Sequence, residues 1–255
     1  MLRPVIALLA LSAALAGCGS REATHPTMHE DGHEHGHEQE HEQEQEQEQE
    51  QEHEHDHHAG AMPHRFENAD EWSKVFDEPS RDAWQKPDEV VTLVAAAPGM
   101  TVADLGAGTG YFLARLSKAV GPTGKVLGLD VEPDMVRFMT ERAAKEKLGN
   151  VEARTVKVDD PGLAAQSVDR ILVVDTWHHV EQRDRYVPWL ARALRPGGTV
   201  LVVDFTMEAQ HGPPVKHRIA PEQVARELEA AGLSPTIVSE ALPDQYVVRG
   251  EKRGG

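Results

Sequence analysis

The stretch VADLGAGTGYF at residues 102–112 decides the fold. Three glycines, Gly106, Gly108 and Gly110, separate an apolar segment that predicts a strand from one that predicts a helix. Glycine tolerates φ > 0 and has no Cβ, so a ligand can lie against the backbone of such a turn. The dinucleotide fingerprint G-x-G-x-x-G has its last glycine where this chain has Tyr111. The spacing therefore favours a cofactor without a pyrophosphate over NAD.

Around this turn the hydrophobic pattern alternates between strand and helix. Strands are predicted at 102–105, 125–130, 151–156, 168–174 and 199–205, and helices at 87–97, 111–120, from 133 onward, 183–194 and 221–231. Residues 234–250 predict two more strands, an antiparallel pair joined at Pro243–Asp244. Alternating strands and helices indicate a parallel sheet covered on both faces. We therefore expect an α/β, doubly wound, mostly parallel seven-stranded sheet with an antiparallel C-terminal hairpin.

Two carboxylates accompany the glycine turn. Asp104 lies two residues before Gly106, and Asp130 ends the next predicted strand. Ligands of open α/β sheets bind beyond the carboxyl ends of the strands. A carboxylate at Asp104 would repel a pyrophosphate but attract a cationic amino-acid head, and Asp130 stands where an acid accepts hydrogen bonds from two ribose hydroxyls.

Together these residues resemble the class I S-adenosylmethionine-dependent methyltransferases, in which DLGAGTG (104–110) is the first motif. ILVVDTWHHV (171–180), LRPGG (194–198) and RIAPEQVARELEAAGL (218–233) match later motifs in the same order. The chain is most similar to the small-molecule methyltransferases of ubiquinone and menaquinone synthesis. The resemblance implies S-adenosylmethionine as cofactor, with Asp159 or Asp160 at the adenine. The cofactor-binding residues that it implies are Asp104, Gly106, Ala107, Gly108, Gly110, Tyr111, Asp130, Val131 and Asp159.

Methyl transfer from a sulfonium is a single displacement, so positioning supplies most of the acceleration and a base is needed only when the acceptor must lose a proton. His179 and His178, after the fourth strand, are the catalytic candidates, with a structural or cofactor-side role as the alternative. Other candidates for the acceptor side are His211, Lys216 and His217, which otherwise belong to a solvated loop, and Trp84 and Trp177, which otherwise pack the core.

The charge of the chain is concentrated near its start. Residues 21–58 contain 14 Asp and Glu and one Arg, and thus supply −13 of the formal net charge of −17 over 255 residues. Such a segment has nothing apolar to bury, so we expect residues 18–63 to be a disordered tether. The remainder has no basic excess that would attract nucleic acid, and we expect none as a partner.

Residues 1–17 predict a bacterial lipoprotein signal peptide, because a short apolar run ends in LAGC, which resembles a lipobox. The resemblance implies acylation of Cys18, the sole cysteine, and a membrane-anchored protein of the cell envelope, on the periplasmic side and at the outer membrane. The folded domain is predicted over 64–255. The alternative is translation from Met28 or Met62; a start at Met62 would give a cytoplasmic protein.

The histidines of the tether have the composition of a weak Zn, Ni or Cu site. They are His33, His35, His37, His53, His55, His57 and His58. No metal site is expected in the folded domain. Two functions from different classes remain: an envelope-tethered methyltransferase acting on a small, lipophilic molecule, and a non-catalytic lipoprotein of the same fold with a metal-binding tail.

Overall fold

The computed structural model describes residues 66–239 and 242–254. All of them belong to one compact unit, Asp56–Gly255; the other unit, Met1–His55, lies outside the described residues. The predicted signal peptide, Cys18 and the tether histidines therefore have no structural test. Within the described ranges, no helix combines the length and apolar character that crossing a membrane requires.

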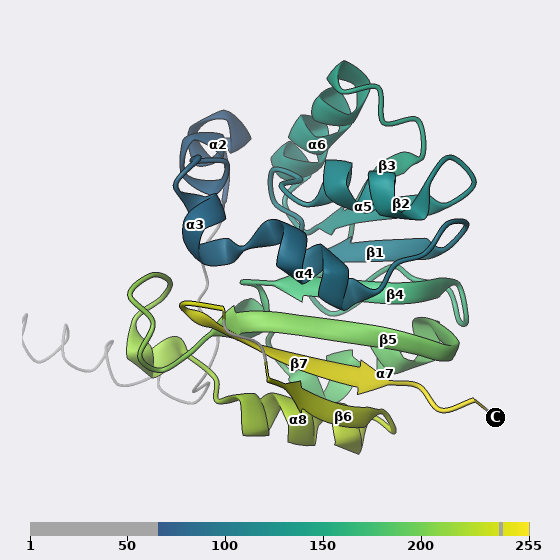
Figure 1. Ribbon diagram of the computed structural model, residues 1–255, viewed down its shortest axis with the longest axis vertical. Helices are drawn as coiled ribbons and strands as arrows, with labels where there is room; N and C mark the ends of the chain where they lie inside the picture. Colours follow the sequence, from purple (N-terminus) through teal and green to yellow (C-terminus); the bar gives the residue numbers. More distant parts are fainter. Residues whose placement is uncertain (1–65, 240–241, 255) are drawn as a thin grey trace, which may run out of the picture. The chain divides into compact units, whose positions relative to one another are not determined.

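The described chain forms one seven-stranded sheet in the order β3-β2-β1-β4-β5-β7-β6 (Figure 1). The strands are β1 (Thr101–Leu105), β2 (Lys125–Asp130), β3 (Val151–Thr155), β4 (Val168–Val174), β5 (Leu194–Phe205), β6 (Ser234–Val238) and β7 (Gln245–Glu251). Strands β1 to β5 pair in parallel, whereas β7 runs antiparallel between β5 and β6. The strand order reverses between β1 and β4, which is where ligands of such sheets bind.

Helices connect the strands and cover the sheet. They are α2 (Ala69–Phe76), α3 (Arg81–Gln85), α4 (Pro87–Val94), α5 (Leu113–Val120), α6 (Pro133–Lys145), α7 (Arg183–Ala193) and α8 (Pro221–Ala230), with 3₁₀ turns η1 (Trp177–His179) and η2 (Val215–His217). Pro87, Pro133 and Pro221 each occupy the first helical position, where the missing N–H costs no hydrogen bond. The sequence signals for these three helix starts are confirmed.

Two hydrophobic cores lie on opposite faces of the sheet. One contains Val90 of α4, Leu116 of α5 and Met139 of α6, and the other contains Leu190 of α7 and Leu228 of α8. Figure 1 shows α4, α5 and α6 on the face turned toward the viewer. The predicted doubly wound α/β fold with an antiparallel C-terminal hairpin is thus confirmed.

Three predicted boundaries differ from the structure by two residues or more. Helix α4 ends at Val94 instead of residue 97. Strand β5 begins at Leu194 instead of residue 199, because Val168 pairs with Leu194 across a register shift at the start of β4. Helix α5 begins at Leu113, since Tyr111 and Phe112 still belong to the turn that follows Gly110.

Candidate active site

The glycine turn joins the carboxyl end of β1 to α5. Gly106, Gly108 and Gly110 have φ of 69°, 54° and 82°, the left-handed region that glycine adopts without strain. A Cβ on Gly106 would lie 2.4 Å from the side chain of Thr176, the second residue after β4. The first glycine is therefore required by close packing between the loops that follow β1 and β4.

Asp104 is a buried carboxylate with an unused acceptor. It is 3% exposed, and within the described chain its Oδ2 atom has no hydrogen-bond partner. Burial raises the pKa of Asp104 from 3.8 to about 7, although the charge of Arg81 acts in the opposite direction; the charge of Asp130 raises the pKa further. Because a buried polar group without a partner costs free energy, this oxygen marks a place for a cationic ligand group.

Asp130 fixes the shape of the turn from the end of β2. Its Oδ2 accepts the N–H of Gly108 (2.8 Å) and its Oδ1 accepts the N–H of Glu132 (3.0 Å). Burial raises the pKa of Asp130, and these backbone hydrogen bonds oppose the rise. Val131 follows with 42% exposure, and Asp159 is exposed in the segment after the neighbouring strand β3. The three predicted positions of the nucleoside side thus follow the carboxyl ends of β2 and β3.

Helices α2 and α3 lie over the glycine turn. No sequence motif predicted this arrangement. The ring of Phe76 lies 3.4 Å from the point where a Cβ of Gly108 would stand. The carboxylate of Asp77 accepts hydrogen bonds from the Thr109 hydroxyl (3.1 Å) and from Arg142 of α6 (2.9 Å). Arg142 also donates to the Thr109 carbonyl (3.2 Å), so α2, α6 and the turn are held together.

A closed ring of four polar side chains attaches α3 to the sheet. Arg81 donates to Asp175 (3.2 Å) and, by two hydrogen bonds of 2.9 and 3.2 Å, to Gln85. Gln85 donates to Gln245 (2.6 Å), which donates to Asp175. Burial raises the pKa of Asp175 to about 7, against the lowering effect of Arg81. Sequence reasoning missed all four; the spacing of Arg81 and Gln85, which puts them on one face of α3, was the available signal.

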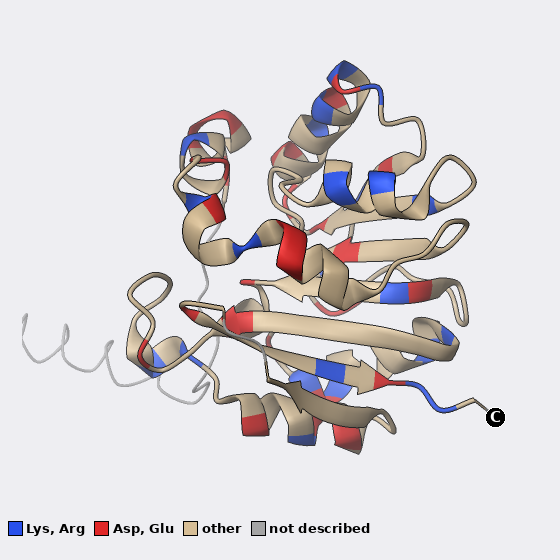
Figure 2. Ribbon diagram, viewed as in Figure 1, with Lys and Arg blue, Asp and Glu red and all other residues tan. Residues whose placement is uncertain are grey.

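The two predicted histidines lie together, and His178 is paired with a carboxylate. His178 is 3% exposed, and its Nδ1 lies 2.8 Å from Oδ1 of Asp204, at the end of β5. The same carboxylate accepts the backbone N–H of His178 (3.1 Å). The ring of His179 lies 4.3 Å from that of His178 and meets Phe66 edge-on. Figure 2 shows an acidic (red) segment at the end of β5 that lies toward α3 in this view.

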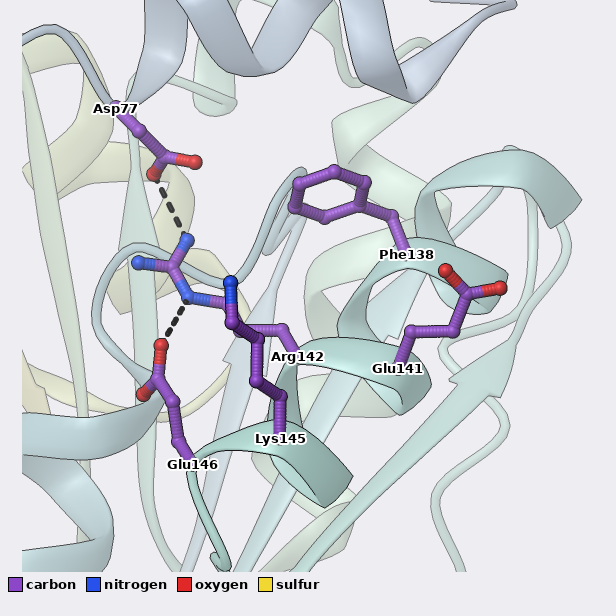
Figure 3. Close-up of a pocket in the computed structure, with 6 residues that line it drawn as sticks. All are labelled: Asp77, Phe138, Glu141, Arg142, Lys145 and Glu146. Carbon is purple, nitrogen blue, oxygen red and sulfur yellow. Dashed lines mark hydrogen bonds and ion pairs between the residues drawn. The ribbon is translucent and has the colours of Figure 1, made fainter.

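A separate hollow of about 340 Å³ lies against the outer side of α6 (Figure 3). It is lined by Asp77, Phe138, Glu141, Arg142, Lys145 and Glu146. Arg142 is already bound to Asp77 and Glu146, and Glu141 is bound to Arg137. Because none of the predicted site residues lines it, we do not assign this hollow as the reaction site.

Comparison with known proteins agrees with this geometry. A family model described as a methyltransferase domain matches residues 96–239, more than half of the chain. The crystal structure of an S-adenosylmethionine-dependent methyltransferase from Aquifex aeolicus is 30% identical, with a TM-score of 0.67, and the alignment covers 72% of this chain and 98% of that one. The chain belongs to the class I S-adenosylmethionine-dependent methyltransferases.

Two curated relatives of this methyltransferase domain differ in what they methylate. The arsenite methyltransferase of Halobacterium salinarum is 35% identical over 115 residues, which is 45% of this chain and 29% of the relative. The ubiquinone/menaquinone biosynthesis C-methyltransferase UbiE of Hydrogenovibrio crunogenus is 28% identical over 128 residues, half of each chain. The chain thus spans half the length, or less, of these curated relatives.

The methyltransferase site fits the family's cofactor on its own chemistry. The amino-acid end of S-adenosylmethionine carries an ammonium and a carboxylate, and the site offers the unpartnered Oδ2 of Asp104 together with the guanidinium of Arg81. At its three glycines the turn presents backbone, with the ring of Phe76 against Gly108, and Asp130 stands at the adjacent strand end.

The remaining aromatic candidates have different surroundings. Trp177 is fully buried, and its indole N–H donates to Glu227 (2.8 Å), so it is a core residue. Trp84 is partly exposed and stacks on the His211 ring. Tyr111 donates its hydroxyl to Asp82 and lies under the guanidinium of Arg81, 4.3 Å from the ring centroid.

The metal prediction has a limited test. In residues 66–239 and 242–254, no group of three or more His, Cys, Asp and Glu side chains is arranged to hold a metal ion. The tether histidines lie outside those ranges, so a metal on the tail stays a prediction.

Proposed function

We propose that this protein transfers the methyl group of S-adenosylmethionine to a small, lipophilic, ring-bearing molecule. The observation that carries the proposal is the orphan Oδ2 of Asp104, buried beside Arg81 at the strand end that opens into three glycines. In a domain that binds no cofactor, an unpartnered buried carboxylate would only lower the free energy of unfolding.

Each side of the cofactor has a proposed partner in the chain. Asp104 accepts from the ammonium and Arg81 attracts the carboxylate, since the two side chains are themselves close enough to interact. Asp130 accepts from the ribose hydroxyls with the lone pairs that Gly108 and Glu132 leave unused. Val131 and Asp159 flank the adenine.

When bound, S-adenosylmethionine supplies an electrophilic methyl group whose leaving group is a neutral thioether. His178 is the proposed base for an acceptor that must lose a proton. Asp204 holds the Nδ1–H of His178, which leaves Nε2 with a lone pair, the arrangement that orients a general base.

The residues of the chain favour one chemical class of methyl acceptor over another. Trivalent arsenic is a soft centre that prefers thiolate ligands, and Cys18 is the sole cysteine of the sequence. The folded domain therefore has no thiolate with which to hold arsenite. An aromatic acceptor, as in the name of the quinone-pathway relatives, agrees better with Trp84, Phe205 and two histidines at the carboxyl edge.

Calorimetric titration of the full chain with S-adenosylmethionine and S-adenosylhomocysteine tests the cofactor assignment. Asp130→Ala is expected to weaken binding by about 10- to 100-fold through lost charged hydrogen bonds. Asp184→Ala, an exposed acid of α7, is the matched control and leaves affinity unchanged. Absence of binding at millimolar ligand would overturn the proposal. Binding without release of S-adenosylhomocysteine in the presence of 1,4-dihydroxynaphthalene would instead favour the non-catalytic alternative.

We further propose that the methyltransferase domain is tethered to the cell envelope through acylated Cys18, with the segment 18–63 as the spacer. The support is the sequence LAGC after an apolar run. In a bacterial host that processes lipoproteins, the full chain then partitions into the detergent phase, and Cys18→Ser moves it to the aqueous phase. Aqueous partition of the unmutated chain would exclude the tether.

A further inference from the structure

A second histidine–carboxylate pair lies at the same edge of the sheet. Nδ1 of His211, in the loop between β5 and α8, is hydrogen-bonded to Oδ2 of Asp244, the residue before β7. The Asp244 side chain is 9% exposed, whereas that of His211 is 49% exposed. This pair therefore presents an imidazole to solvent from a buried carboxylate, while the pair of His178 and Asp204 is buried as a whole.

The sequence predicted a solvated loop around His211, but hydrogen bonds within the protein hold this loop in place. The guanidinium of Arg218 donates to five of its carbonyl groups: those of Thr206, Met207, Ala209, His211 and Pro213. Gly212 has a φ of 90°, and a Cβ there would lie 2.5 Å from the ring of Phe205. The imidazole is thus held in one position before any ligand arrives. Lys216 and His217, in η2, take no part in this arrangement.

Trp84 connects the pair of His211 and Asp244, here called the outer pair, to the proposed methyl-transfer site. Its ring stacks on that of His211, with centroids 4.8 Å apart and planes at 12°. The ring of Phe205 lies 5.9 Å from Trp84 and 6.2 Å from His178, so the two histidine pairs flank one aromatic side chain.

The state of the outer pair follows from its hydrogen bonds. Burial raises the pKa of Asp244, but hydrogen bonds from His211 and from the backbone N–H of Gln210 outweigh burial and leave this pKa lowered. When the imidazole is neutral, the carboxylate accepts the proton on Nδ1, which leaves a lone pair on Nε2. Among the described residues no donor fills that lone pair. Beside an indole face, this lone pair suits a hydroxyl on a flat ring.

We propose that Trp84, His211 and Asp244 form a recognition subsite for a phenolic or enolic hydroxyl on a flat ring of the methyl acceptor. The inference deepens the proposed function and rests on it for the identity of the ligand as acceptor. His211 binds the hydroxyl through Nε2, Asp244 orients His211, and Trp84 contacts the ring. His178 remains the group that acts at the reacting atom.

The test compares two probes that differ in one proton donor, 2-naphthol and 2-methoxynaphthalene, titrated into the full chain saturated with S-adenosylhomocysteine. The unmutated protein is expected to prefer 2-naphthol by at least about tenfold, because only this probe donates to the imidazole. His211→Phe keeps the stack on Trp84 but removes the lone pair. It is expected to bring the preference close to one while the affinity for 2-methoxynaphthalene stays the same.

Equal affinity of the unmutated protein for both probes would overturn the subsite, as would a preference that survives His211→Phe. Unchanged S-adenosylhomocysteine affinity in the variant shows that it is folded. The subsite and the proposed function fail separately. A 2-naphthol preference without any methyl transfer supports the subsite and refutes turnover. With turnover, His211→Phe raises KM more than it lowers kcat, and His178→Gln does the reverse; the same pattern in both variants contradicts the assigned roles.

Discussion

The two halves of the site are assembled in different ways. On the cofactor side, the turn and its first carboxylate come from one contiguous stretch, and Asp130 lies only 22 residues from Gly108, its hydrogen-bond partner. On the acceptor side, contacts join residues far apart in sequence: 94 positions separate Arg81 from Asp175, and 160 separate Gln85 from Gln245. The cofactor side is therefore visible as a motif, and the acceptor side exists only in the folded chain.

The two halves of the site also differ in whether their buried carboxylates have hydrogen-bond or ion-pair partners. Each acceptor-side carboxylate has a partner: Asp204 has His178, Asp244 has His211, and Asp175 has Arg81, which also faces Asp104 on the cofactor side. Asp104, on the cofactor side, keeps one oxygen without a partner in the described chain. We conclude that the acceptor side is preformed, whereas the cofactor side is completed by its ligand. Removing a charged partner should thus have opposite consequences in the two halves.

The largest effect is expected from Arg81→Met, which breaks the hydrogen-bonded ring of Arg81, Gln85, Gln245 and Asp175. Asp175 would keep only Gln245, and breaking a mostly buried ion pair leaves an uncompensated charge, so the unfolding free energy should fall by about 3 kcal/mol at pH 8. Urea unfolding followed by circular dichroism measures it. At pH 6 the loss should be smaller, since the carboxyl of Asp175, with a pKa of about 7 even beside Arg81, can be protonated.

The control for this change is the double variant Arg81→Met, Asp175→Asn. Removing the charge along with its partner should recover more than half of the lost stability, because the remaining amide still accepts from Gln245. A loss below about 1 kcal/mol in the single variant would mean that the pair behaves as an exposed one and that the acceptor side is not held together by this ring.

Sequence and structure agree where the information is local. The proline starts of α4, α6 and α8, the three glycines and the strand ends at Asp104 and Asp130 follow from neighbouring residues. The roles of Asp204, Asp244 and Gln245 do not. Asp204 meets His178 because β4 and β5 pair in parallel, and Asp244 and Gln245 reach the site because β7 pairs antiparallel with β5. His211 illustrates the limit: its loop is polar and exposed in sequence, and only Arg218 and Gly212, through contacts within the fold, make it rigid.

An effect of opposite sign is expected from Asp104→Asn. The folded pKa of Asp104, about 7, lies above its usual 3.8. Between about pH 4 and pH 7 the folded state therefore binds a proton that the unfolded state has released, and this group lowers the unfolding free energy as pH rises, by at most about 1.4 kcal/mol per pH unit.

Asp104→Asn removes that proton, so the unfolding free energy of the unliganded variant should depend less steeply on pH in this window and should equal or exceed that of the unmutated protein at pH 8. Its affinity for S-adenosylhomocysteine should nevertheless fall, because the amide no longer attracts an ammonium. Urea titrations at pH 5, 6 and 7, with calorimetry at pH 8, measure both. Asp175 shifts in the same direction, so the slope is reduced, not abolished. An unchanged slope together with unchanged affinity would show that the orphan carboxylate is neither strained nor reserved for a ligand, and the contrast between the two halves would be lost.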